Sequence, residues 1–344
     1  MKIVHTADVH LSKDHPERLE ALKEVISVCD EEEADLLLIS GDLFDRNTGP
    51  DDYETEIRPL FSDNSFHTLV IPGNHDESAF REGSYFGNDI DQLLSRPFES
   101  KEYEGVKITG VPYTEEGFSE LVSPLSEESD EDVINLLMIH CTLSGATGGF
   151  GEESKYLPVK PQELIESGYD YVFSGHIHSS ATKKQLENIV FTYPGSPVSI
   201  SSSETGRRHV WVFDTEVEKL ESRKLDTFHY LKEKIEVMPK EEDIIDRAIQ
   251  GFKDKDLSKA SITIELNGFT DRKIQGLTTD VKQRISNLEP KEINVDNSGL
   301  ESMASVINSD IYKEFTSKME KEDLEKPKEV EKKFLRALSR YDRR

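Results

Sequence analysis

The sequence predicts an α/β protein, and two patterns in the chain support that class. Short apolar runs bounded by turn residues, such as Leu36 to Ile39, are typical of strands buried on both faces of a sheet. Between such runs, apolar residues recur with the spacing of an amphipathic helix, as they do from Pro16 to Glu33. The first strand, this helix and the Leu36 strand therefore form one βαβ unit, the building block of α/β proteins.

The rest of the first part of the chain follows the same patterns. A second helix is expected over residues 52–62. Further strands are expected at residues 2–6, 67–71, 106–111, 136–139, 169–173, 189–193 and 207–213. A Gly-rich segment, residues 144–151, either lets the backbone approach a substrate closely or is an ordinary flexible loop.

The character of the chain changes near Met238. A helix over 241–251, a strand over 260–267, a helix over 270–286 and a strand over 291–296 predict a small second domain. Two highly charged helices follow from about residue 308; their apolar faces are formed by Ile311, Phe315 and Met319, and by Val330, Phe334, Leu335 and Leu338. We therefore divide the chain into residues 1–235, 236–300 and 301–344.

The cysteines and the apolar runs of the chain predict the cellular compartment of the protein. The two cysteines, Cys29 and Cys141, show no pairing pattern, which fits a reducing environment. The N-terminus passes directly into a strand pattern, and no run approaches the roughly 18 apolar residues that a spanning helix needs. We expect a cytoplasmic, soluble protein.

The formal net charge of −27 over 344 residues has two interpretations. One is a solvated acidic surface, of the kind suited to a high-salt cytoplasm, that leaves the potential of a binding cleft undecided. Alternatively, nucleic acid is not the substrate, because a nucleic-acid-binding face is usually basic. Bound divalent cations would reverse the local field at a carboxylate-rich site, so the total charge does not decide between the two.

Five of the ten histidines stand where an apolar strand ends. They are His10, His75, His140, His176 and His178. Each alone is explained as a turn residue or a capped core histidine, but five such coincidences are improbable, whereas a shared site explains all of them. Asp8, Asp42 and Asn74 stand at the same strand ends. Open α/β sheets bind ligands at the carboxyl ends of their strands, so we expect these side chains to meet.

This mixture of residue types suits a pair of divalent metal ions. Two metals about 3.5–4 Å apart need a bridging carboxylate, neutral imidazoles and hard oxygen ligands, with positions left open for water and a phosphate. Histidine, aspartate and asparagine together favour manganese, iron or zinc over magnesium. Such a pair supports a phosphoryl-type displacement.

The ordered motifs resemble those of the calcineurin-like metallophosphoesterases. They are DVH at 8–10, GDLFD at 41–45, GNHD at 73–76, His140 at its strand end and GHIH at 175–178. The resemblance implies a β-sandwich flanked by helices, to which residues 236–300 would add a small α+β capping domain and the tail a C-terminal helical arm. It also implies that one metal takes Asp8, His10, Asp42 and His178, and the other Asp42, Asn74, His140 and His176. His75 would face the scissile phosphate as proton donor or charge stabiliser.

Three segments resemble a narrower group, the SbcD-type nucleases of double-strand-break repair and their meiotic-recombination-eleven counterparts. They are MKIVHTADVHL at the N-terminus, GDLFD at 41–45 and TYPGSPVSIS at 192–201. That resemblance implies a homodimeric, manganese-dependent exonuclease and endonuclease that acts on DNA ends. It also implies a coiled-coil ATPase partner of the SbcC or radiation-sensitivity-fifty type.

The resemblance leaves several alternatives open. Many relatives carry a histidine after GDLF, whereas this chain has Asp45, as bacterial members do. Asp45 either caps the next segment or supports a metal-bound imidazole. The other functions to consider are a phosphodiesterase acting on small substrates and a DNA-end scaffold whose chemistry is vestigial.

Contacts to DNA and to a partner are also predicted. Basic residues beside the motif loops are candidates for phosphate contacts: Lys13, Arg18, Lys183, Lys184, Arg207 and Arg208. An ordinary exposed surface explains them equally. In the tail, an apolar stripe of Phe315, Met319, Phe334 and Leu338 either packs against its own domain or binds the partner ATPase.

Overall fold

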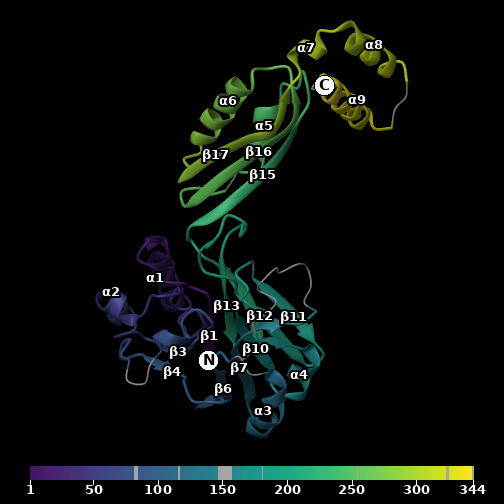
Figure 1. Cartoon of the computed structure of the whole chain (residues 1–344). Coiled ribbons are helices and arrows are strands. Elements are labelled where there is room, and N and C mark those ends of the chain that lie inside the picture. The colour runs from purple at the N-terminus through teal and green to yellow at the C-terminus, as the bar shows by residue number, and fades with distance from the viewer. Residues whose placement is uncertain are drawn as a thin grey trace. The chain divides into compact units, whose positions relative to one another are not determined.

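The computed structural model describes residues 1–80, 84–114, 117–145, 157–179, 181–253, 255–322 and 325–342. The chain forms two compact units, Met1–His229 and Tyr230–Arg344 (Figure 1). Most of the Gly-rich segment 144–151 lies outside the described residues. The further division at residue 300 stays a prediction.

Two six-stranded sheets form the framework of the first unit. One has the order β14 (Lys219–Lys224), β13 (His209–Asp214), β1 (Lys2–Thr6), β2 (Leu36–Ser40), β3 (His67–Ile71) and β4 (Ile90–Gln92). The other has the order β11 (Thr182–Leu186), β12 (Ile189–Tyr193), β10 (Tyr171–Gly175), β7 (Ile134–His140), β6 (Val106–Val111) and β5 (Glu99–Tyr103). The central strands are parallel in both sheets, β1 to β4 in the first and β6, β7, β10 and β12 in the second.

Helices cover the outer faces of these sheets (Figure 1). The first sheet carries α1 (Pro16–Glu31) and α2 (Glu54–Leu60), and the second carries α3 (Val122–Glu128) and α4 (Pro161–Glu166). Short elements complete the unit: β8 (Thr142–Leu143), β9 (Pro158–Val159) and the 3₁₀ turns η1 (Pro50–Tyr53), η2 (Glu77–Ala79) and η3 (Phe118–Glu120). The predicted α/β sandwich flanked by helices is confirmed.

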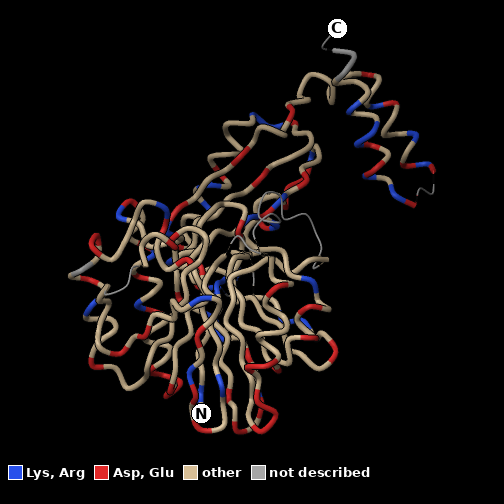
Figure 2. The backbone as a smooth tube through the Cα atoms, turned by 60° about the horizontal axis from the view of Figure 1, so that its bottom comes forward, with Lys and Arg blue, Asp and Glu red and all other residues tan. Residues whose placement is uncertain are grey.

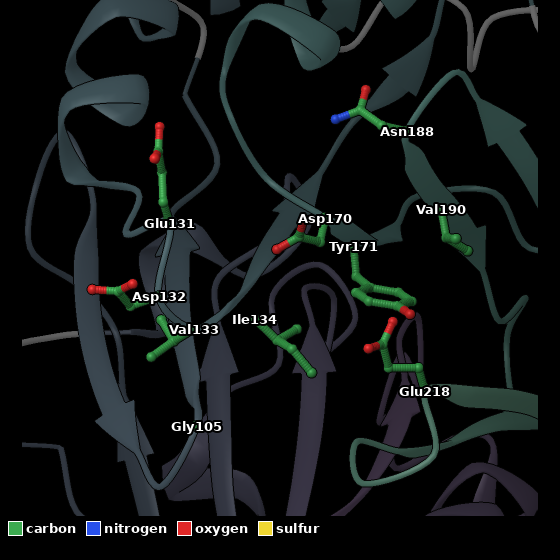
Figure 3. Close-up of a pocket in the computed structure, with 10 residues that line it drawn as sticks. All are labelled: Gly105, Glu131, Asp132, Val133, Ile134, Asp170, Tyr171, Asn188, Val190 and Glu218. Atoms are coloured by element: carbon green, nitrogen blue, oxygen red, sulfur yellow. The ribbon is translucent and has the colours of Figure 1, made fainter.

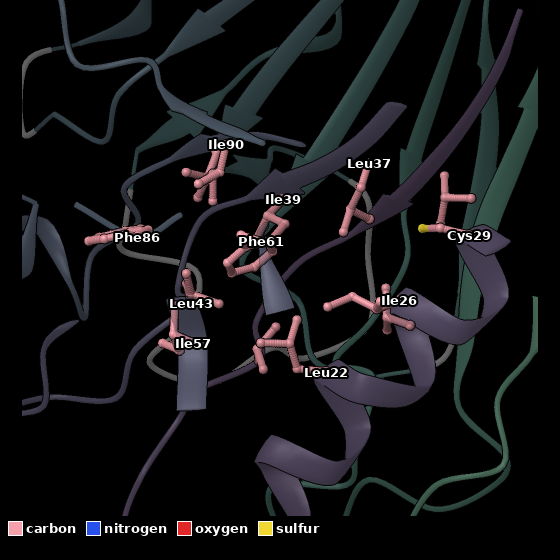
Figure 4. Packing of buried hydrophobic residues seen from close by; sticks show 14 of the residues in the cluster. Leu22, Ile26, Cys29, Leu37, Ile39, Leu43, Ile57, Phe61, Phe86 and Ile90 are labelled. Atoms are coloured by element: carbon pink, nitrogen blue, oxygen red, sulfur yellow. The ribbon is translucent and has the colours of Figure 1, made fainter. Parts of the chain in front are cut away.

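Strand β2 shows why the sequence produces a layered core. All five of its residues are buried. Leu37 and Ile39 point toward α1 and pack with Leu22 and Ile26 (Figure 4). Leu36 and Leu38 face the other way, into the core between the two sheets. Because side chains alternate along a strand, one continuous apolar run serves two cores, as the sequence predicts.

The second unit is a three-stranded sheet with two helices on it. The strands are β15 (His229–Val237), β16 (Ala260–Thr270) and β17 (Glu292–Ser302), in that order. Helices α5 (Ile244–Gln250) and α6 (Ile274–Ser286) share their core. Strands β16 and β17 extend further than the sequence predicts. Residues Ser261 to Thr270 of β16 pair in parallel with β17, across an irregularity near Glu265.

The tail consists of α7 (Ala304–Ile307), α8 (Asp310–Met319) and α9 (Pro327–Asp342). Tyr312 and Leu335 are buried in a cluster of their own unit, and the rings of Phe315 and Phe334 stack with centroids 3.8 Å apart. Ile311, grouped with Phe315 and Met319 in the sequence pattern, is 62% exposed. Tyr312 is buried instead, and its hydroxyl donates to Glu331 of α9.

The stripe of Phe315, Met319, Phe334 and Leu338 is half-buried. The tail helices therefore pack on their own unit in part, and partner binding stays a prediction. In the described ranges, no helix is both long and apolar enough to cross a membrane.

Candidate metal centre

Side chains from five parallel strands meet at one end of the first unit. Asp8 and His10 follow β1, Asp42 follows β2, and Asn74 and His75 follow β3. The other sheet supplies His140, the last residue of β7, together with His176 and His178, which follow β10. The ligands thus come from two packed sheets rather than from the edge of one.

One group of four side chains is arranged to hold a single ion. The ligand atoms of Asp8, His10, Asp42 and His178 all lie within 4.8 Å of one another. His10 Nε2 is 3.6 Å from an Asp42 oxygen, and His178 Nε2 is 3.6 Å from an Asp8 oxygen. These are the four residues predicted for the first metal.

The residues predicted for the second metal lie beside the first group. His140 Nε2 is 3.3 Å from Asp42 Oδ2 and 3.0 Å from Asn74 Oδ1, and the same Asn74 oxygen is 3.2 Å from His176 Nδ1. Oδ2 of Asp42 therefore faces both His10 and His140. That is the position a bridging carboxylate needs.

The backbone at these positions adopts conformations that side chains usually avoid. Asp8, His10 and Asp42 have φ angles of 56°, 52° and 53°, and that of His176 is 98°. Positive φ is uncommon outside glycine, and clusters of such residues occur at functional sites, where the surrounding structure holds them. Here the two turns hold each other: the Asp8 amide donates to the Gly41 carbonyl and the His10 amide to that of Asp42.

Glycines leave the space that these side chains need. A Cβ atom on Gly73 would lie 2.2 Å from Asp42 Oδ1. Gly41 has a φ of 93°, and a Cβ there would lie 2.3 Å from His140 Nδ1. The glycines of the GDLFD and GNHD motifs are thus required by packing around the centre.

Main-chain groups orient the ligands. The amide of His75 donates to Asp42 Oδ1 at 2.8 Å, and the amide of His176 donates to the Asp8 carboxylate at 3.0 Å. His140 Nδ1 lies 2.9 Å from the Ser40 carbonyl. A proton on that Nδ1 leaves the Nε2 lone pair of His140 directed at the centre.

His75 stands at the rim of the centre beside Asp45. Its Nδ1 is 3.3 Å from Asp45 Oδ1, and His10 Nδ1 is 3.9 Å from the same oxygen. The Arg18 guanidinium donates to the other Asp45 oxygen at 2.7 Å. Burial would raise the pKa of Asp45, but the hydrogen bonds from His75 and Arg18 lower it. Asp45 Oδ1 also accepts from the Arg46 amide at 2.8 Å, so Asp45 caps the following segment and lies beside His75 and His10 as well.

The carboxylates and imidazoles shift one another's pKa values. Burial raises the pKa of Asp8 to about 6 against the effect of His140 and His178. Burial would also raise the pKa of Asp42, but the charge and hydrogen bond of His140 hold it well below its usual range. Against burial, Asp42 raises the pKa of His140 to about 9, and Glu204 and Asp8 raise that of His178 to about 9. The imidazolium protons balance the buried carboxylates.

The residues fit a pair of divalent cations. The Nε2 atoms of His10 and His178 lie 3.0 Å apart, so one of the two nitrogens must carry a proton unless a cation accepts both lone pairs. A cation would replace the imidazolium protons as the balancing charge. Mixed nitrogen and oxygen donors suit manganese, iron or zinc.

Comparison with known proteins assigns the centre to a family. Residues 1–180 match the calcineurin-like phosphoesterases. The chain belongs to this family. It is therefore a metal-dependent phosphoester hydrolase, and the family's dinuclear metal centre corresponds to the Asp and His cluster described above. The predicted superfamily is confirmed, whereas the SbcD type stays a prediction.

Solved structures with a similar arrangement have low sequence identity. TT1561 of Thermus thermophilus is 16% identical, with 65% of this chain and 98% of that one covered and a TM-score of 0.46. A dimetal phosphatase from Danio rerio is 10% identical, with 65% and 96% covered and a TM-score of 0.47. Yfce, a phosphoesterase from E. coli, is 13% identical, with 66% and 100% covered and a TM-score of 0.33. The family assignment rests on the sequence match.

The predicted DNA contacts fall into two groups. Arg18 and Arg208 are buried, at 5% and 2% exposed, and they donate to the carbonyls of His10 and Ser196 respectively. Both support the centre from within the protein, so neither is a surface cation available to a phosphate. Arg207 pairs with Asp226 at 3.2 Å, and Lys13 with Glu56 at 3.4 Å.

Lys183 and Lys184 lie on β11, with Lys183 exposed and Lys184 half-buried. DNA contacts of the four surface residues stay predictions; these residues are Lys13, Lys183, Lys184 and Arg207.

Two residues that support the centre are not among those predicted from the sequence. Asp76 is fully buried and accepts from the amides of Gly73 and Phe44, which fixes the GNHD and GDLFD turns to each other. Its place inside GNHD could have indicated this role. Glu204 lies 3.4 Å from His178 Nδ1. It belongs to none of the motifs, so no signal in the sequence indicates it.

A pocket of about 360 Å³ lies at the opposite ends of the strands (Figure 3). It is lined by residues that precede or begin strands of the second sheet, among them Gly105, Ile134 and Tyr171. Acidic side chains dominate it: Glu131, Asp132, Asp170 and Glu218. Many loops at this end, where the N-terminus lies, are acidic (Figure 2).

Proposed function

We propose that the protein is a two-metal, manganese-dependent DNA nuclease that hydrolyses phosphodiester bonds at DNA ends in double-strand-break repair. The observation that carries the proposal is the convergence of all seven predicted ligands around the shared carboxylate of Asp42, with His75 beside them. A ligand residue is present at every predicted position, which argues against a catalytically inactive centre.

The residues of the chain divide the work between them. Bound metal ions would activate a water molecule and offset the charge of the phosphate. Asp42 and the buried imidazoles would hold these ions, and the turns with positive φ keep the ligand atoms fixed. An imidazolium His75 would donate an Nδ1 hydrogen bond to Asp45 and would give its Nε2 proton to the leaving oxygen as that oxygen's bond to phosphorus breaks. Arg18 holds Asp45 in position for this contact.

The exposure of the site supports a large substrate. Asp8, Asp42 and His140 form a floor at most 1% exposed, whereas the side chains of His178 and His75 are 18% and 25% exposed. An exposed rim over a buried floor admits a phosphate that belongs to a long polymer. The PGSP segment, one basis for the SbcD-type resemblance, packs here too, since Ser196 donates to the His178 carbonyl.

The tail supports the proposal of an ATPase partner. Ile311 of α8 and Val330 of α9 are 62% and 37% exposed, and they lie beside the half-buried stripe of Phe315 and Phe334. Exposed apolar residues on an otherwise charged helix pair suit the base of a coiled coil. Ile311→Glu should abolish co-elution with an SbcC-type ATPase in gel filtration without lowering nuclease activity. Unchanged co-elution would contradict partner binding here.

A phosphodiesterase acting on small substrates is the second candidate, and the net charge of −27 favours it. The deciding experiment offers the purified protein two substrates with manganese: end-labelled linear duplex DNA and a generic aryl phosphodiester. We expect DNA cleavage that chelation with EDTA abolishes and that Asp42→Ala lacks. Cleavage of the aryl ester alone would reject DNA as substrate and retain the metal centre.

A further inference from the structure

Glu204 contacts the outer nitrogen of a metal-centre histidine. Its Oε1 lies 3.4 Å from His178 Nδ1, an ion-pair contact slightly longer than the roughly 3.2 Å of an ordinary N–H···O hydrogen bond. The other ring nitrogen, Nε2, is the one that faces Asp8 and His10. A proton on Nδ1 shared with Glu204 therefore leaves the Nε2 lone pair for the centre.

The surrounding turn fixes Glu204. Its Oε2 accepts from the amide of Ile200 at 2.8 Å and from the Ser196 hydroxyl at 3.4 Å. Its Oε1 accepts from the Ser201 hydroxyl at 3.1 Å. The side chain is 11% exposed, so these contacts have little competition from water.

A second contact holds the main chain of the same histidine. The Arg208 guanidinium donates to the carbonyls of His178 and Ser196. His178 is thus held at its carbonyl by Arg208 and at its ring by Glu204. This matters because the His178 side chain is 18% exposed, whereas that of His140 is fully buried and bonded to the Ser40 carbonyl.

We infer that Glu204 is a positioning residue that orients His178 for one of the two metal ions. The inference rests on the metal centre of the proposed function. It concerns one ion because His178 belongs to the group of Asp8, His10 and Asp42, whereas the second predicted set is built on His140 and His176. Outer partners of this kind change metal affinity by about 10–100-fold.

The test is calorimetric titration of the metal-free protein with manganese chloride. The amide nitrogen of Glu204→Gln would face either the Ile200 amide or the His178 Nδ1 proton, each of them a donor, so at least one contact would be lost. We expect Glu204→Gln to weaken one ion by about 10–100-fold. The affinity for the second ion should stay unchanged, and the thermal midpoint of the metal-free protein should fall only slightly, because one contact is lost.

Two further variants sharpen the result. Glu204→Ala removes the acceptor altogether and should weaken the same ion at least as much. Glu221→Gln is the matched control, because the Glu221 side chain is 64% exposed on β14 and pairs with Lys219; it should bind both ions as the wild type does. Wild-type affinity for both ions in Glu204→Gln and Glu204→Ala would overturn the inference.

An equal loss of affinity for both ions, together with a lower thermal midpoint of the metal-free protein, would also overturn the inference. Glu204 would then support only the fold. A wild-type protein that binds no manganese would reject the metal centre and this inference together. A wild-type protein that binds two ions but cleaves no DNA would reject only the nuclease proposal, because the affinity change of Glu204→Gln is measured without substrate.

Discussion

The two ends of the sandwich in the first unit both carry carboxylates, yet they are built differently. At the carboxyl ends of the strands, Asp8 and Asp42 are at most 1% exposed and share their space with His10 and His178. Burial there is offset by imidazoles, by main-chain donors and by turns with positive φ. Charges that would be unfavourable alone become a preorganised site.

At the amino ends, acidic residues line an open pocket whose described lining residues include no histidine (Figure 3). Asp170 accepts from the amide of Asn135, so its carboxylate serves the local backbone. In the part of the chain that the structure describes, the acid and histidine groups close enough to hold one ion all include residues of the carboxyl ends. In this protein, histidines, burial and fixed backbone geometry distinguish the metal centre from the acidic pocket.

The largest effect should come from removing the shared carboxylate. Asp42→Ala deprives both predicted metal positions of a ligand and leaves the imidazoles to repel one another. We expect phosphodiester cleavage to fall to background and manganese binding to be lost, measured by activity assay and calorimetry. Asp170→Asn at the opposite end is the control and should retain both properties. An Asp42→Ala protein that still binds two ions would contradict the bridging role.

Removing His75 should separate chemistry from metal binding. In our proposal His75 acts on the leaving group, and it is not among the seven ligands. His75→Ser should therefore reduce cleavage by roughly 10²- to 10⁴-fold, the usual range for a general acid, with manganese content unchanged by elemental analysis. Loss of metal together with activity would show that His75 is a ligand.

The elements and the convergence of ligands could be predicted from the sequence because both follow from local patterns. The apolar run of β2 predicts a buried strand, and the motif residues stand directly at strand ends. The predicted helix at 52–62 is shorter in the structure, where η1 precedes α2. Helix ends depend on capping and tertiary contacts, which periodicity does not encode.

Contacts between distant segments could not be predicted. Glu204 meets His178 only because the turn after β12 returns to the end of β10. Arg208 was a candidate for surface DNA contacts, but it is 2% exposed beneath the His178 carbonyl. Which face of a sheet a charged residue meets depends on how the two sheets pack, and no local pattern carries that information.

His5, on β1 just before the metal end, should make stability depend on pH. Its ring stacks on Phe173 at 4.7 Å, and burial lowers its pKa to about 3. The unfolded chain binds a proton below about pH 6.5 while the folded protein does not, so stability falls as the pH drops from about 6.5 toward 3. The contribution is up to about 1.4 kcal/mol per pH unit.

The measurement compares urea unfolding of the wild type with that of His5→Gln in EDTA between pH 4.5 and 7.5. Burial raises the pKa values of Asp8 and Asp76 to about 6 and 7, and these groups act in the opposite direction in both proteins. The difference between the two proteins therefore isolates His5. We expect wild-type stability to fall faster with acid than that of the variant, and parallel curves would contradict a neutral buried His5.

The smallest effect should come from neutralising the acidic pocket at the amino ends. The double variant Glu131→Gln, Glu218→Gln removes two charges from a surface without compensating cations. Stability should change by less than about 0.5 kcal/mol, as is usual for surface positions. If repulsion matters at all, the variant gains stability in low salt and loses that gain at about 0.5 M salt, where charges are screened within a few ångströms.

Manganese titration of the variant should match that of the wild type, since the centre at the other end has its own imidazoles to balance its carboxylates. A change in manganese affinity would show that the two ends communicate, and the contrast between a built site and an acidic surface would have to be abandoned.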